Sequence, residues 1–177
     1  MTKLFVAAIA LLLSIGLAQA QTVRKVEIYE YGTYSSSPDI ELGVTRQGMP
    51  YGGLDYIDLV DMTDTVIAQL GVKFGFRYRL VGPPEGTAVP LKMVMRYPSP
   101  GIMAEGAKRP FTDDDYTVVQ YVGDDLFRTW TFTERTDLVP GIWTFEIWHG
   151  KKKLAEKKFK VILPPIAGLT SELKPGA

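Results

Sequence analysis

Three consecutive carboxylates, Asp113, Asp114 and Asp115, form the densest group of side chains in this sequence that could do chemistry. Carboxylates can bind calcium, and a pair of them can act as acid and base in glycoside hydrolysis. The cluster lacks the alternating acidic positions and the closing glutamate of a calcium-binding loop. We therefore expect solvated turn residues here, with calcium binding and a carboxylate-dependent hydrolase as alternatives.

The single histidine, His149, stands before a run with six lysines in EIWHGKKKLAEKKFKV (residues 146–161). Acyl transfer needs a nucleophile held beside a base, and the chain has no second imidazole and no G-x-S-x-G turn. Cysteine is absent, so thiolate nucleophiles, disulfides and cysteine metal ligands are excluded. We assign no catalytic residue, no metal site and no cofactor, and we expect a protein that is not an enzyme.

Two long segments between the regular patterns are the better candidates for a binding surface. Residues 46–60 are rich in glycine and then acidic, and residues 98–115 are rich in proline, glycine and charge. Loops of this length in a compact domain are often functional, and aromatic rings in a loop can stack on sugars or bases. The candidate ligand-binding residues are Tyr51, Tyr56, Arg109, Asp113, Asp114 and Asp115.

The first twenty residues, MTKLFVAAIALLLSIGLAQA, have the composition of a secretory signal. A start with Lys3 is followed by an apolar run over residues 4–17 and by small residues at Ala18 and Ala20. We expect cleavage before Gln21 and a periplasmic or secreted protein. The run is shorter than the roughly 18 residues that a membrane-spanning helix needs, and we expect no span in the rest of the chain.

Charge gives no sign of a nucleic-acid partner. The chain has 20 Lys and Arg against 20 Asp and Glu, and loss of Lys3 with the signal leaves a net charge of −1. Proteins that bind nucleic acid normally carry a concentrated positive field. We therefore expect no nucleic-acid binding.

Period-two alternation of apolar and polar residues is the main structural signal. In GVKFGFRYRL (71–80) every second residue from Val72 to Leu80 is apolar, and VPLKMVMRY (89–97) repeats the pattern. Similar runs occupy residues 23–34, 40–45, 116–122, 125–133, 141–148 and 153–163. Residues 61–71 could form a short helix or a fragment of strand.

Short strands at this spacing are typical of two packed antiparallel sheets. We expect an all-β protein, an antiparallel two-sheet β-sandwich of immunoglobulin-like character. It would form a single domain over residues 21–163, followed by a flexible tail over residues 164–177.

The last two runs predict a hairpin. Trp143, Phe145 and Ile147 would point into the core, and Phe159, Val161 and Leu163 would form the matching inward row. The phase of Leu154 predicts a bulge or a slipped register near the turn, where His149 would be exposed. Lysines on a final edge strand hinder pairing with other chains, and contact with an anionic surface is the alternative interpretation.

Three stretches resemble a family of short exported bacterial proteins that is classed only as a domain of unknown function: VEIYEYGTYS (26–35), LGVKFGFRYRLVGPPEG (70–86) and PGIWTFEIWHGKKKLAEKKFKV (140–161). The last also looks like the closing strands of immunoglobulin-like modules in bacterial extracytoplasmic proteins. The resemblance implies a fold and a compartment but no catalytic residue. We expect a binding or accessory module of the cell envelope with a protein or glycan partner, and the hydrolase remains the alternative.

Overall fold

The structure is a computed structural model that describes residues 23–165 except for 39, 54–55, 83 and 105. The expected leader, and the expected tail from residue 166 onward, lie outside the described residues. No helix of the described part has the length and apolar character to cross a bilayer.

The described residues form β-strands and one short 3-10 helix. The strands are β1 (Lys25–Ser36), β2 (Ile40–Val44), β3 (Pro50–Gly53), β4 (Ile57–Asp61), β5 (Thr65–Ile67), β6 (Lys73–Val81), β7 (Ala88–Arg96), β8 (Asp113–Tyr121), β9 (Leu126–Thr131), β10 (Gly141–His149) and β11 (Lys152–Ile162), and the helix is η1 (Arg135–Asp137).

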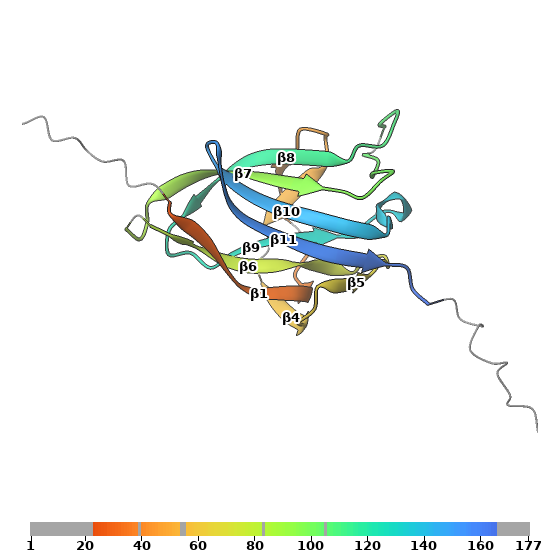
Figure 1. The fold of residues 1–177 in the computed structure, drawn as a ribbon, viewed down its shortest axis with the longest axis horizontal. Coiled ribbons are helices and arrows are strands. Elements are labelled where there is room, and N and C mark those ends of the chain that lie inside the picture. The colour runs from red at the N-terminus through yellow and green to blue at the C-terminus, as the bar shows by residue number, and fades with distance from the viewer. Residues whose placement is uncertain (1–22, 39, 54–55, 83, 105, 166–177) are drawn as a thin grey trace, which may run out of the picture.

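Two sheets pack face to face (Figure 1). One has the strand order β4-β1-β6-β9 and the other has the order β5-β11-β10-β7-β8, while β2 and β3 form a separate hairpin. The strands of the two sheets pair antiparallel, apart from β5, which runs parallel to the end of β11. The fold is thus all-β, the two-sheet sandwich that the sequence predicts.

Aromatic side chains from both sheets fill the core. The Phe74 ring on β6 makes edge-on contacts with Trp143 and Phe145 on β10 and with Phe159 on β11, at centroid distances of 5.9, 5.7 and 5.3 Å. Each of these rings is fully buried, and burial of such a side chain stabilises the fold by about 1.5–3 kcal/mol. The predicted inward row of β10 is confirmed.

The last hairpin differs from the prediction in two details. The bulge is present, between Ile147 and Trp148. Leu163 is 57% exposed, because β11 ends at Ile162, so its inward assignment is wrong. β5 pairs only with Lys160–Ile162, so β11 has a strand partner on one side only along residues 152–159.

Residues 46–60 are not a long loop, as the sequence suggested, because they contain β3 and β4. Residues 61–71 supply a strand fragment, β5, and no helix. The expectation that Asp113, Asp114 and Asp115 are turn residues is also wrong, since they begin β8. Partners from residues 45–47 satisfy these carboxylates, which is why a strand can start on three acids.

The β2–β3 hairpin lies on an excursion of the chain between β1 and β4. A hydrogen bond from Ser37 N to Tyr56 O, 3.2 Å, closes its base. Its tip reaches the other sheet, where Arg46 N donates to Asp115 O at 2.8 Å. The hairpin therefore bridges the two sheets on the side where β8 and β9 form their edges.

A pair of glycines sets how closely the strands of the four-stranded sheet approach. Gly32 on β1 faces Gly75 on β6. A Cβ atom at Gly32 would lie 1.9 Å from Asp61 O on β4, and one at Gly75 would lie 2.1 Å from Arg128 O on β9. Only glycine fits at either position without displacing a neighbouring strand.

Candidate functional site

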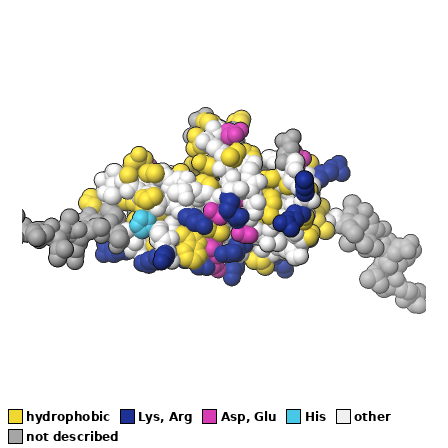
Figure 2. All heavy atoms as spheres, turned by 90° about the horizontal axis from the view of Figure 1, so that it is seen from above, with side chains coloured by type: hydrophobic (Ala, Val, Ile, Leu, Met, Phe, Trp, Pro, Cys, Tyr) yellow, Lys and Arg dark blue, Asp and Glu magenta, His cyan; other side chains and the backbone are white. Residues whose placement is uncertain are grey.

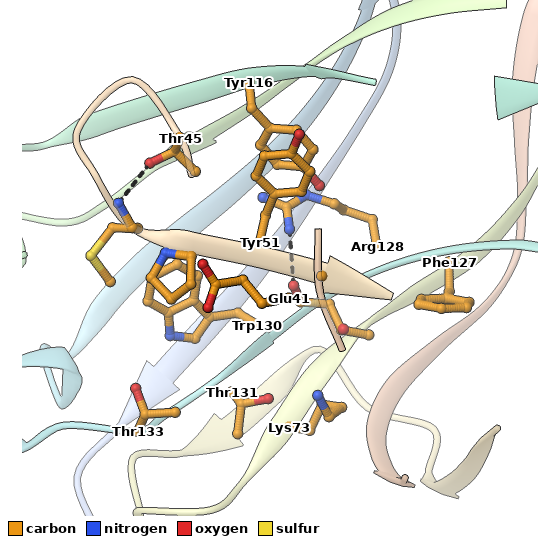
Figure 3. A pocket seen from close by; sticks show the side chains of 14 residues that line it. Glu41, Thr45, Tyr51, Lys73, Tyr116, Phe127, Arg128, Trp130, Thr131 and Thr133 are labelled. Carbon is orange, nitrogen blue, oxygen red and sulfur yellow. Dashed lines mark hydrogen bonds between the residues drawn. The ribbon is translucent and has the colours of Figure 1, made fainter. Parts of the chain in front are cut away.

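A cleft of about 320 Å³ lies between the β2–β3 hairpin and β9 (Figure 3). The hairpin contributes Glu41, Thr45 and residues 49–52, and β9 contributes residues 127–131. Lys73, Tyr116 and Thr133 complete the lining. We call this space the β9 cleft.

β9 presents an open strand edge to the β9 cleft. Among the described strands it pairs only with β6. The close approach of Arg128 O to Gly75 shows that this carbonyl points toward β6. Because main-chain groups alternate in direction along a strand, those of Phe127 and Thr129 point the other way, into the cleft.

Two stacked tyrosine rings line the cleft. Tyr51 on β3 stacks on Tyr116 on β8, with ring centroids 3.9 Å apart and planes within 10°. The Arg128 guanidinium carbon lies 5.1 Å from the centroid of Tyr116 and 5.6 Å from that of Phe145. Figure 3 shows the guanidinium beside the two stacked rings.

Arg128 has few polar partners. Its Nη1 donates to Thr129 O at 3.0 Å, and its buried Nε has no hydrogen-bond partner among the described residues. Arg46, Arg77 and Arg96 each form an ion pair with a carboxylate. Arg128 forms none with the residues that the structure describes, although it is partly buried.

Trp130 supplies a second buried donor on the cleft wall. Its ring packs against Tyr97 and Trp143, with centroid distances of 5.5 Å in both cases. Its Nε1 is buried and has no hydrogen-bond partner in the part of the chain that the structure describes. The Glu41 carboxylate, on an exposed residue of the lining, lies within ion-pair distance of no cation in the described part of the chain.

The acidic cluster holds the hairpin against β8. Arg46 binds Asp113 and Asp115 at 2.8 and 2.7 Å, and Lys92 lies 3.4 Å from Asp115. Partial burial disfavours the charge of Asp115, but hydrogen bonds from Arg46 and Lys92 outweigh this and hold the pKa of its carboxyl below the usual value. The acidic cluster therefore joins the β2–β3 hairpin to β8.

Asp114 is the buried member of the cluster, with 2% of its surface exposed. It points to the opposite side of β8 from its neighbours and accepts hydrogen bonds from Gln47 N, at 2.9 Å, and from the Thr45 hydroxyl. The three consecutive acids therefore bind residues 45–47, in the turn between β2 and β3, from both faces of β8.

The other candidate residues from the sequence are dispersed. Tyr51 lines the β9 cleft, whereas Tyr56 and Arg109 do not. Tyr56 is 56% exposed and precedes β4. Arg109 is exposed in the segment between β7 and β8 and binds none of the described carboxylates.

Sequence reasoning missed Arg128, Trp130 and Tyr116. A signal existed for Arg128, since it shares the parity of Leu126, Trp130 and Phe132 in the run 125–133. An arginine on an otherwise apolar inward row is unusual, and it indicates a position where the edge of the core borders a polar space.

The charges outside the cleft form no single basic patch. Figure 2 shows basic side chains spread over one face of the molecule, with acidic ones between some of them. Lys153 pairs with Glu146 and Glu156, and Lys158 pairs with Glu156. No group of three or more His, Asp or Glu side chains converges as metal ligands within the described residues.

The two packed sheets form a β-sandwich, and its similarity to a solved structure gives it immunoglobulin-like character. The chain is a member of the family described as a domain of unknown function, DUF3859, whose model matches residues 22–161. It is similar to an immunoglobulin-like protein, PA1606, from Pseudomonas aeruginosa, known from a crystal structure at 1.50 Å resolution. The two share 30% identity over 78% of this chain and 97% of the other, with a TM-score of 0.52. No functionally curated protein shows significant similarity to the chain.

Proposed function

We propose that this protein is a binding module that takes an extended polypeptide segment into the β9 cleft, where the segment adds to β9 as a further strand. The open edge of β9 within the cleft is the observation that carries this proposal. An added strand gains affinity from main-chain hydrogen bonds, and its alternate side chains meet pockets that give specificity. The hairpin would cover the bound segment on its other side.

The aromatic lining gives less support to a glycan. Stacking on a sugar needs a free ring face. Tyr116 already carries Tyr51 and the Arg128 guanidinium, and Trp130 is packed against Tyr97 and Trp143. Glu41 is the one carboxylate among the described lining residues, so no pair of acids favours the hydrolase.

The proposed setting is the cell envelope. The leader-like residues 1–20 support export, and the family match is consistent with the resemblance to exported proteins. The partner would then be the extended segment of another envelope protein. This protein would act as a non-enzymatic accessory to it.

Selection of displayed random heptapeptides on the immobilised protein tests the proposal. We expect enriched peptides that compete for one site. In a strand added to β9, every second amide bonds to the edge, so N-methylation of one alternate set of amides abolishes binding and methylation of the other set is tolerated. Peptides without this alternation, or no enriched peptide, would refute strand addition.

A pair of proline variants locates the site. Thr129→Pro removes a main-chain donor that faces the cleft, and we expect peptide affinity to fall by about ten-fold or more. Val119→Pro is the matched control on the outer edge of β8, because residue 119 shares the direction of Asp115, whose carbonyl bonds outward to Arg46. Equal affinity of both variants, with unchanged melting temperatures, contradicts the assignment to β9.

A further inference from the structure

We infer that Arg128 makes the β9 cleft selective for a polypeptide that presents a carboxylate. The inference rests on the proposed function and specifies the chemistry of the partner. Its basis is a partly buried guanidinium that faces the cleft without a counter-ion among the described residues.

The position of Arg128 is costly unless a ligand compensates for it. A charge that is partly removed from water without a partner loses solvation. Arg77, which is also partly buried, avoids this cost by pairing with Glu30 at 3.1 Å. Among the described residues, Arg128 has one hydrogen bond, to a carbonyl of its own strand, and two aromatic neighbours.

The aromatic contacts hold the guanidinium in place without neutralising it. The guanidinium carbon lies 5.1 Å from the centroid of Tyr116, and Tyr51 stacks on Tyr116 from the hairpin. A planar guanidinium on aromatic rings is preorganised for two parallel hydrogen bonds to a carboxylate. The arrangement therefore favours an acid over a neutral amide.

The buried side-chain polar atoms of the described cleft wall that lack a hydrogen-bond partner are both donors. On the described lining residues they are Arg128 Nε and Trp130 Nε1. A ligand rich in acceptors satisfies such a wall, and a carboxylate is the strongest acceptor that a polypeptide carries. The carboxylate would come from an Asp or Glu side chain or from the C-terminus of the partner.

Glu41 opposes this preference. Its exposed carboxylate is on the hairpin side of the same cleft, so it lowers the affinity for an acid by an amount that solvent screening limits. Removing that charge should tighten the binding of an acidic peptide. A cleft selective for bases would respond in the opposite direction.

The probe is a heptapeptide from the selection above, synthesised with an acetylated N-terminus and either an amidated or a free C-terminus. We expect the selected peptides to contain an Asp or Glu at a fixed position. Replacing that acid with its amide should weaken binding to the wild-type protein about 10- to 100-fold. If the free C-terminus is the source instead, amidation causes the loss.

Protein variants identify the partner of the acid. In Arg128→Gln the replacement of the peptide acid should have little further effect, and Arg128→Lys should bind with intermediate affinity because it keeps the charge and loses the planar fork. Arg109→Gln is the matched control, an exposed arginine outside the cleft, and should bind like the wild type. Glu41→Gln should bind about two-fold more tightly.

The outcomes separate the two proposals. Two results would overturn the selectivity and leave strand addition standing. In the first, the selected peptides add to β9 but contain no acid. In the second, replacing the peptide acid with its amide weakens binding equally in the wild type and in Arg128→Gln. Failure to select any peptide overturns both. If Arg128 variants do not fold, the amide-for-acid peptides and Glu41→Gln decide the question on an otherwise native cleft.

Discussion

Glu146 shows how a single buried acid can be accommodated at the surface of a sheet. It lies on the outward row of β10 but is only 4% exposed. Arg96, Trp148 and Lys153 cover it and donate hydrogen bonds at 3.0, 2.8 and 3.3 Å. Burial disfavours its charge, but these donors outweigh that effect and hold the pKa of Glu146 below the usual value.

The lowered pKa gives Glu146 a pH-dependent role in stability. Since its folded pKa is below the unfolded value of about 4.3, its contribution is fully present above that pH and is lost as the pH falls through the folded pKa. We expect Glu146→Gln to reduce the free energy of unfolding by about 1–3 kcal/mol at pH 7, with a smaller difference from wild type at pH 3. Urea unfolding at both pH values measures this.

Glu156→Gln is the control for Glu146, because Glu156 pairs with Lys153 and Lys158 in a more exposed setting. Its effect at pH 7 should be below about 1 kcal/mol. A difference between Glu146→Gln and wild type that stays constant from pH 7 to pH 3 would contradict the ionic origin of the effect.

At the level of single residues, side-chain parity was predictable and side-chain partners were not. The inward row of Trp143, Phe145 and Ile147 follows from alternation alone. Alternation also assigns Glu146 to the outward row, but its partner Arg96 comes from β7, fifty residues away, and cannot be inferred from alternation. Arg128 was overlooked because its surroundings depend on Tyr51, which a distant hairpin brings to Tyr116.

At the level of elements, strands with a regular alternation of apolar and polar residues were easiest to predict. β6, β7, β10 and β11 follow the period-two pattern closely. The hairpin strand β3 consists of PYGG, which has no such pattern, and exists because β2 pairs with it. The acidic start of β8 was missed because its partners lie in the same hairpin.

The β2–β3 hairpin should depend on Asp114 for its attachment to β8. Asp114→Ala removes the acceptor for Gln47 N and the Thr45 hydroxyl, and each lost hydrogen bond costs about 1 kcal/mol. We expect amide hydrogen exchange in residues 40–53 to accelerate by about ten-fold or more, with β6 and β10 unchanged. Exchange resolved by residue provides the measurement.

Asp113→Asn is the milder comparison for the hairpin, because Asp113 is half exposed and Arg46 retains Asp115. Its effect on exchange in residues 40–53 should be small. If Asp114→Ala leaves the hairpin as protected as in wild type, the attachment depends on the Tyr51–Tyr116 stack instead.

At the level of the whole molecule, the two sheets and their packing were predictable, whereas the cleft was not. Composition and turn spacing are sufficient for a sandwich, because any such chain must bury one face of each sheet. The cleft arises from a connection between β1 and β4 that crosses to the β8 and β9 edges, and local sequence does not encode such a path.

Export is the prediction that concerns the chain as a whole. When the full chain is produced in a bacterial host, we expect the protein outside the cytoplasm, with Gln21 as its first residue by intact mass and N-terminal sequencing. Ala18→Arg and Ala20→Arg should block this processing, because the cleavage site requires small residues. An intact leader in the wild-type protein would contradict the interpretation of residues 1–20 as a cleaved signal.

The glycine pair in the four-stranded sheet limits how this protein can vary. Gly32 and Gly75 lie side by side in one row across the sheet, and the outer members of that row belong to β4 and β9. A methyl group at position 75 would push β9 outward and shift the wall of the cleft. If the β9 cleft binds a segment as proposed, a substitution at Gly75 would therefore alter that binding from a buried position that lines no part of the cleft.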